Sequence, residues 1–187
     1  MLTQDLRLND ILKPFCQIHW HEPPTGSLEP LLTQKNEPSG LRYRAIPLSA
    51  KPPPFARHPT QDGTQSVAYE IVDERTSGRL VVAPDVAAIT PELLIAMESA
   101  DGILFDGTFW SNHEFQQITG KPRTADDMGH HVIQNGSLNV LRKLKARHKV
   151  YFHINNTNPI LNPGSPECAE VKHAGMVVGY DGLELDL

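Results

Sequence analysis

Apolar and polar positions alternate clearly from residue 40 onward. Residues 41–48 alternate in the way that is typical of a strand with one buried face. Residues 66–72 and 79–83 also have strand patterns, and the Ser-Gly pair at positions 77 and 78 marks a turn between them. The pattern therefore predicts a strand followed by a hairpin, separated by a proline-rich loop over residues 51–63.

The rest of the chain alternates between short buried strands and helices. Thr90 and Pro91 have the residue types of a helix N-cap and of the first helical position. Ser111 and Glu114 have the spacing of a capping box. The predicted strands cover residues 79–83, 102–105, 149–154 and 176–180, and the predicted helices cover 91–100, 113–118, 137–147 and 166–174. This order predicts an α/β fold.

The first 39 residues show no comparable order. Apart from a short helical pattern over residues 6–12, prolines interrupt every regular run before residue 39. We expect residues 1–39 to form an irregular, proline-rich lead-in, and residues 40–187 to form one domain.

Composition narrows the function classes. The 187 residues suit one domain, and a net charge of −5 without a basic stripe argues against nucleic-acid binding. Apolar runs stay well below the roughly 18–20 residues of a membrane span. The polar N-terminus lacks a signal-peptide core, and two cysteines imply no disulfide framework. These features predict a protein of the bacterial cytoplasm.

Polar side chains follow several of the predicted strands. Asp85, Asp106 and His153 lie at or just after strand ends, and His130 lies in a loop before a helix. Ligands gather beyond strand ends in α/β sheets, and carboxylates with imidazoles bind divalent metals. Two alternatives stay open, because an Asp-Gly pair is also typical of a turn and a buried histidine also bonds to backbone.

A second arrangement of histidines occurs near the start of the chain. His19 and His21 flank Trp20, a spacing that suits a metal on one face of a strand.

Three separated motifs carry a family resemblance. They are DGTFW at residues 106–110, MGH at 128–130 and HINNTNPIL at 153–161, followed by SPE and YDG. Together they resemble the C-terminal portion of the pyrroloquinoline quinone (PQQ) biosynthesis protein B family, within the metallo-β-lactamase-like superfamily. The resemblance implies an αββα sandwich, of which residues 40–187 would form the C-terminal half.

The resemblance also implies roles for the site residues. His153 would bind a divalent iron or zinc ion. Asp85 is a further candidate ligand because of its place after a predicted strand, not because of the resemblance. Asp106 and His130 would be catalytic, through proton transfer or ligand orientation. The superfamily's His-x-His-x-Asp-His loop and the family's cysteine cluster do not occur in this sequence. We therefore expect an incomplete metal site in a chain that is truncated, split across two genes or started internally.

The function that the resemblance implies is metal-dependent hydroxylation of a tyrosine-derived PQQ precursor, either a small molecule or a peptide. The partner would be a separate N-terminal half or a second copy of the chain. Two alternatives stay open: a soluble helper in transport of PQQ or its precursor to the periplasm, and an inactive fragment.

Overall fold

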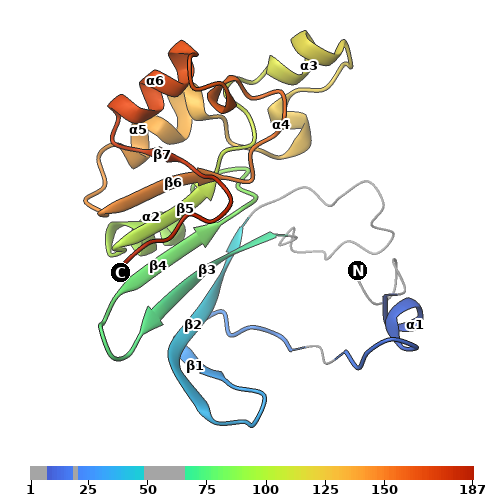
Figure 1. The fold of residues 1–187 in the computed structure, drawn as a ribbon, viewed down its shortest axis with the longest axis vertical. Coiled ribbons are helices and arrows are strands. Elements are labelled where there is room, and N and C mark those ends of the chain that lie inside the picture. The colour runs from blue at the N-terminus through green and yellow to red at the C-terminus, as the bar shows by residue number, and fades with distance from the viewer. Residues whose placement is uncertain (1–7, 19–20, 49–65) are drawn as a thin grey trace.

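The computed structural model describes residues 8–18, 21–48 and 66–187 (Figure 1). Within these ranges the strands form one seven-stranded sheet whose spatial order follows the order of the sequence. The strands are β1 (Glu29–Leu32), β2 (Pro38–Leu48), β3 (Ser66–Asp73), β4 (Arg79–Ala83), β5 (Gly102–Asp106), β6 (His148–Phe152) and β7 (Val177–Val178).

The sheet changes character at β4. Strands β1 to β4 pair antiparallel, whereas β4, β5, β6 and β7 pair parallel. Parallel neighbours need a crossover, and helices supply it. The helices are α1 (Leu8–Leu12), α2 (Pro91–Glu98), α3 (Glu114–Thr119), α4 (Ala125–Met128), α5 (Leu138–Leu141) and α6 (Pro166–His173). The predicted α/β alternation after residue 79 is confirmed.

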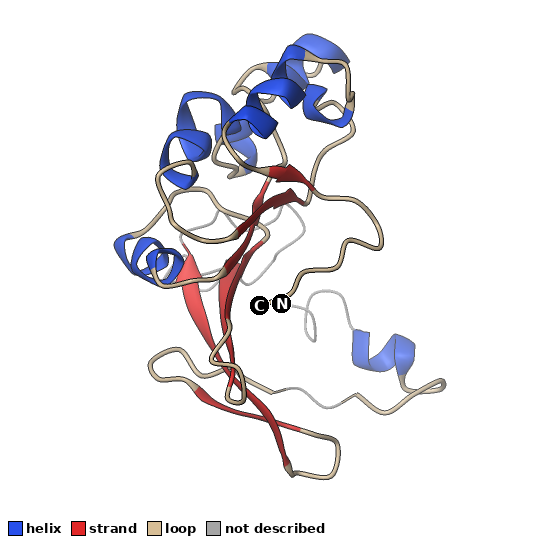
Figure 2. Cartoon of the chain, turned by 60° about the vertical axis from the view of Figure 1, so that its left-hand side comes forward, coloured by secondary structure: helices blue, strands red, loops and turns tan. Residues whose placement is uncertain are grey.

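The main core lies between the sheet and the crossover helices. Ile103 and Phe105 of β5 belong to one buried cluster with Met97 of α2, Leu141 of α5 and Val171 of α6. Figure 2 shows α1 on the other side of the sheet from these helices. The expected cap of α2 is present, because the Thr90 side chain accepts a hydrogen bond from the Leu93 amide. Ser165 caps α6 in the same way through the Cys168 amide.

The opposite face of the sheet is less deeply buried. Its side chains include Tyr43, Ile71, Leu80, Leu104 and Phe152, all partly exposed. The C-terminal segment crosses part of this face. A Cβ atom at Gly102 would lie 2.7 Å from Leu187 Cδ2, so the sheet and the C-terminal segment are in direct contact there.

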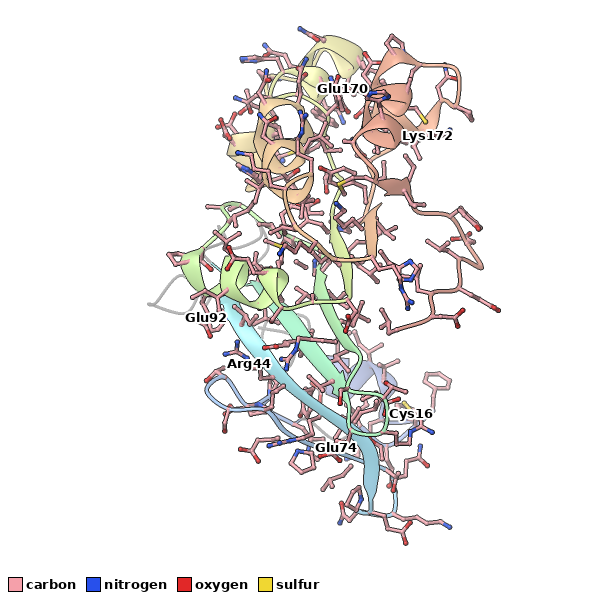
Figure 3. All side chains as sticks on the ribbon, turned by 90° about the vertical axis from the view of Figure 1, so that its left-hand side faces the viewer. Cys16, Arg44, Glu74, Glu92, Glu170 and Lys172 are labelled. Atoms are coloured by element: carbon pink, nitrogen blue, oxygen red, sulfur yellow. The ribbon has the colours of Figure 1, made fainter. Side chains whose placement is uncertain are left out.

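A charged cluster lies where α2 approaches the antiparallel strands. Glu70 is 3% exposed and pairs with the guanidinium groups of Arg44 and Arg79. Arg44 also bonds to Glu92 of α2 at 2.9 Å, and Figure 3 shows these two side chains close together. Every charge of the cluster therefore has an opposite charge beside it.

Several predicted elements are wrong in their extent. The segment before residue 40, expected to be irregular, contributes β1 and the start of β2. The predicted helix over residues 137–147 stops at Leu141, where the Lys149 ammonium donates to the carbonyls of Leu141 and Leu144. Between the predicted helices over residues 113–118 and 137–147 lies a helix that the sequence did not predict, α4, which has a capping box of its own.

The capping box predicted at Ser111 is also wrong. Helix α3 starts at Glu114 itself, and its N-cap His113 makes no side-chain capping bond. The Glu114 carboxylate is buried and accepts instead from the Trp110 amide and the Thr157 hydroxyl. The predicted loop over residues 51–63 lies outside the described residues.

Candidate metal centre

Parallel pairing brings two of the predicted site residues to one edge of the sheet. Asp106 is the last residue of β5 and pairs with Phe152, the last residue of β6. His153 follows at once, so its imidazole starts from the same edge. His130 arrives from the loop after α4, which Gly129 turns with a φ of 81°. Topology therefore assembles side chains that are distant in sequence.

The three side chains come close enough to share a cation. His130 Nδ1 lies 2.8 Å from Asp106 Oδ2, and His153 Nδ1 lies 3.7 Å from Asp106 Oδ1. One donor atom from each residue lies within 4.8 Å of the others. It is the single such group in the described part of the chain. Asp106, His130 and His153 therefore form one candidate metal site.

The Asp106 carboxylate is fully buried and accepts several hydrogen bonds. It accepts from the Val86 amide at 3.0 Å, the Thr108 amide at 2.9 Å, the Thr108 hydroxyl at 2.5 Å and His130 at 2.8 Å. Burial by itself raises the pKa of Asp106, but the bonds from His130, His153 and Thr108 outweigh it and bring this pKa to about 2. Asp106 is therefore an anion at any physiological pH.

His153 is the most open member of the group. Its side chain is 49% exposed, and its backbone has a φ of 55°, in the left-handed region. The neighbouring Asp106 carboxylate raises the pKa of His153, against the smaller effect of desolvation. The imidazole therefore combines access to solvent with a fixed anionic neighbour.

Asp85 lies beside this group and outside it. Its carboxylate is 3.6 Å from His130 Nδ1 and is 45% exposed. Partial burial raises the pKa of Asp85. Of the four residues predicted from sequence, the structure thus brings three into one donor set and leaves Asp85 next to it.

Side chains that the sequence did not single out hold the surrounding loops. Thr108 bonds to both Asp106 and His153. Asn158 donates to the Gly107 carbonyl at 2.8 Å, and the Thr157 hydroxyl donates to Glu114 at 2.6 Å. These bonds tie the loop after β6 to the loop after β5. The buried Glu114 was visible in the sequence, but its signal was taken for a cap.

The donor set fits a divalent metal of borderline character. Two imidazoles and a carboxylate are the ligands that zinc and non-haem iron(II) use in sites with open positions. This set is richer than the one histidine and one carboxylate expected for the metal. His19 and Trp20, the core of the other predicted arrangement, lie outside the described residues.

The chain belongs to the β-lactamase superfamily, because the model of the β-lactamase superfamily domain matches residues 1–154. Its curated relatives are more specific. It is 37% identical to coenzyme PQQ synthesis protein B of Cupriavidus necator, over 96% of this chain and 59% of that protein. The protein of the same name from Nitrosococcus oceani is 34% identical, over 100% of this chain and 62% of that protein. The expected resemblance is confirmed.

Solved structures agree with this placement. Zn(2+)-bound PqqB from Methylobacterium extorquens superposes with a TM-score of 0.75 and 29% identity, covering 87% of this chain and 54% of that one. A diphosphatase of the PhnP family, with a TM-score of 0.55 and 19% identity, shares the fold alone. The metallo-β-lactamase-like fold is thereby confirmed.

The chain spans 59% and 62% of the length of these two curated relatives. The described helices include none long and apolar enough to cross a membrane.

Proposed function

We propose that this chain takes part in coenzyme PQQ synthesis, in a divalent-metal-dependent enzyme that hydroxylates a tyrosine-derived precursor. The grouping of Asp106, His130 and His153 at the carboxyl edge of the sheet carries the proposal. The similarity to PQQ synthesis protein B supplies the pathway. The zinc named for the PqqB structure supports a divalent metal without deciding between zinc and iron.

The imidazoles and the carboxylates of the site have different roles. His153, half exposed, and His130 each have Nδ1 turned to the Asp106 region, which leaves Nε2 as the atom for a metal or a proton. Asp106 holds the negative charge that steadies both rings. Asp85 is sited to take up or release a proton near His130, or to complete the ligand set.

A bound iron(II) ion would make redox chemistry with molecular oxygen possible. A bound zinc ion would act as a Lewis acid only. The protein side of the reaction is then orientation and proton handling. The Asp106 anion keeps a hydrogen on His130 Nδ1, which leaves one lone pair on Nε2. If His130 Nε2 binds the metal, Asp85 is the group placed to take a proton from the substrate phenol, and if it does not, Nε2 itself can accept that proton.

Metal analysis of the purified chain tests the proposal. We expect about one divalent ion per chain after reconstitution with Fe(II) or Zn(II), lost in His153→Ala. His173→Ala is the matched control, since His173 is exposed on α6 and outside the group. Absence of bound metal in the unaltered chain with both ions would contradict the proposal. Turnover of the precursor that requires iron, oxygen and an added two-electron reductant would identify the hydroxylase, with water formed from the second oxygen atom.

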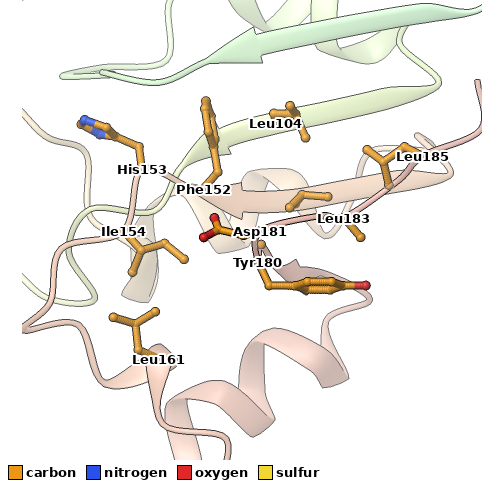
Figure 4. A pocket seen from close by; sticks show the side chains of 11 residues that line it. Leu104, Phe152, His153, Ile154, Leu161, Tyr180, Asp181, Leu183 and Leu185 are labelled. Carbon is orange, nitrogen blue, oxygen red and sulfur yellow. The ribbon is translucent and has the colours of Figure 1, made fainter.

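A second candidate, a non-catalytic carrier of the quinone or its precursor, is favoured by a cavity next to His153. The cavity measures about 460 Å³ and combines apolar side chains of β5, β6 and the C-terminal segment with Tyr180 and Asp181 (Figure 4). That volume suits one small aromatic ligand. Calorimetry with PQQ separates the two functions, because a carrier binds it equally well with and without metal.

A further inference from the structure

The hydroxyl of Thr108 lies between the buried carboxylate and the exposed imidazole. Thr108 Oγ1 is 2.5 Å from Asp106 Oδ1 and 3.0 Å from His153 Nδ1. It also lies 2.9 Å from the His153 carbonyl oxygen. The direct distance from Asp106 Oδ1 to His153 Nδ1 is longer, at 3.7 Å. Both contacts of the hydroxyl are within hydrogen-bond distance and the direct contact is not, so Thr108 Oγ1 links the carboxylate to His153.

The hydroxyl has one proton and can donate to only one of its neighbours. Asp106 offers a charged acceptor at the shortest distance, and charge-assisted bonds are the stronger ones. With the proton directed there, Thr108 Oγ1 turns its lone pairs toward His153. The His153 Nδ1 atom must then carry a hydrogen to bond to Thr108, which leaves Nε2 unprotonated.

We infer that Thr108 is a positioning residue that fixes the tautomer of His153, so that Nε2 is the nitrogen presented to a metal. Asp106 acts on His130 directly and on His153 through this hydroxyl. One buried anion thus sets the same tautomer on two imidazoles that reach it from different loops. The metal-binding consequence rests on the proposed function, whereas the tautomer does not.

Thr108 is 7% exposed, and its hydroxyl has a competing arrangement in which it donates to His153 Nδ1. That bond would place the ring hydrogen on Nε2, whereas a hydroxyl that donates to the His153 carbonyl still offers a lone pair to Nδ1. The two tautomers give different imidazole spectra, so they can be separated without any metal.

Nitrogen-15 NMR of the imidazoles in the metal-free chain tests the inference. At a pH where the rings are neutral, we expect His153 to be protonated at Nδ1 in the unaltered chain and in Thr108→Ser. Thr108→Val should show a mixture of tautomers. An unaltered chain with His153 protonated at Nε2 overturns the inference without any variant. Retention of the pure Nδ1–H form in Thr108→Val also overturns it.

Metal affinity gives the second readout. Competition with a chromophoric chelator should show zinc bound about 10- to 100-fold more weakly by Thr108→Val, with Thr108→Ser close to the unaltered chain. Thr108→Ala replaces the valine variant if that variant does not fold. Equal zinc affinity in all variants overturns the inference. If the unaltered chain binds no zinc, the proposed function fails, and the tautomer measurement still decides the role of Thr108.

Discussion

Glu70 and Asp106 are two of the almost completely buried carboxylates in the described part of the chain, and they differ in their partners. Glu70 is 3% exposed and Asp106 is 0% exposed. Glu70 faces guanidinium groups, which have no lone pair to offer a metal. Asp106 faces imidazoles, each of which keeps a second nitrogen for other work. Burial of a carboxylate alone therefore says little, whereas the chemistry of its partner separates a structural ion pair from a candidate site.

Position in the sheet explains why the partners differ. Glu70 lies within β3, where antiparallel neighbours and α2 close over it. Asp106 ends a parallel strand, and the carboxyl ends of parallel neighbours meet at one edge. Loops that follow these strands can converge there, so histidines from other parts of the chain reach Asp106.

The largest effect is expected from Asp106→Asn. The amide cannot hold the negative charge that keeps both imidazoles in place, so zinc affinity should fall about 100-fold or more. Chelator competition measures the loss, and circular dichroism confirms that the chain is folded. Unchanged zinc affinity in this variant would mean that Asp106, like Glu70, has only a structural role.

Glu70→Gln should lower the stability of the fold and leave the zinc affinity unchanged. Removal of the charge between two arginines that are themselves 18% and 30% exposed should lower the free energy of unfolding by about 2–3 kcal/mol. Zinc affinity should not change, because the cluster contributes no donor. Urea denaturation gives the first quantity and chelator competition the second. A loss of metal affinity in this variant would show that the two regions are coupled.

Acid should reveal Asp106 as a stabilising anion. Its pKa is about 2 in the folded chain, below its ordinary value of 3.8, so the folded state prefers the charged form. The resulting stabilisation is complete above the unfolded value and is lost as the pH falls through the folded one, by about 2 kcal/mol in total. Unfolding by urea at pH 5 and pH 2 should show this loss. Asp106→Asn should remove that part of the pH dependence of the free energy of unfolding. The same decrease between pH 5 and pH 2 in the variant would contradict the role given to Asp106.

The smallest effect is expected from Asp85→Asn. The Asp85 side chain is 45% exposed, and an exposed charge at 3.6 Å from His130 is worth at most about 1 kcal/mol. Zinc affinity should therefore change by less than about fivefold by the same estimate. A loss as large as that of Asp106→Asn would make Asp85 a ligand, as its place after a predicted strand suggested.

Local signals in the sequence predicted many of the helix starts and strand ends. Thr90 and Ser165 marked true helix starts, and Asp106 and His153 stood out because they end buried strands. The roles of Thr108 and Glu114 were not predicted, because their partners, His153 and Thr157, come more than forty residues later. Strand β1 was missed for a similar reason, since it exists by pairing with β2. Contacts of this kind depend on tertiary packing, which residue pattern alone does not encode.

The left-handed backbone of His153 has a consequence for how such a chain can change over generations. A φ of 55° costs a non-glycine residue about 1 kcal/mol, which glycine does not incur. Replacement of this imidazole by glycine would thus relax the backbone while it removes a donor from the site. At this position the substitution that lowers the backbone strain is therefore also the one that removes a possible metal ligand. Retention of a histidine here in any descendant would therefore record selection for the site itself.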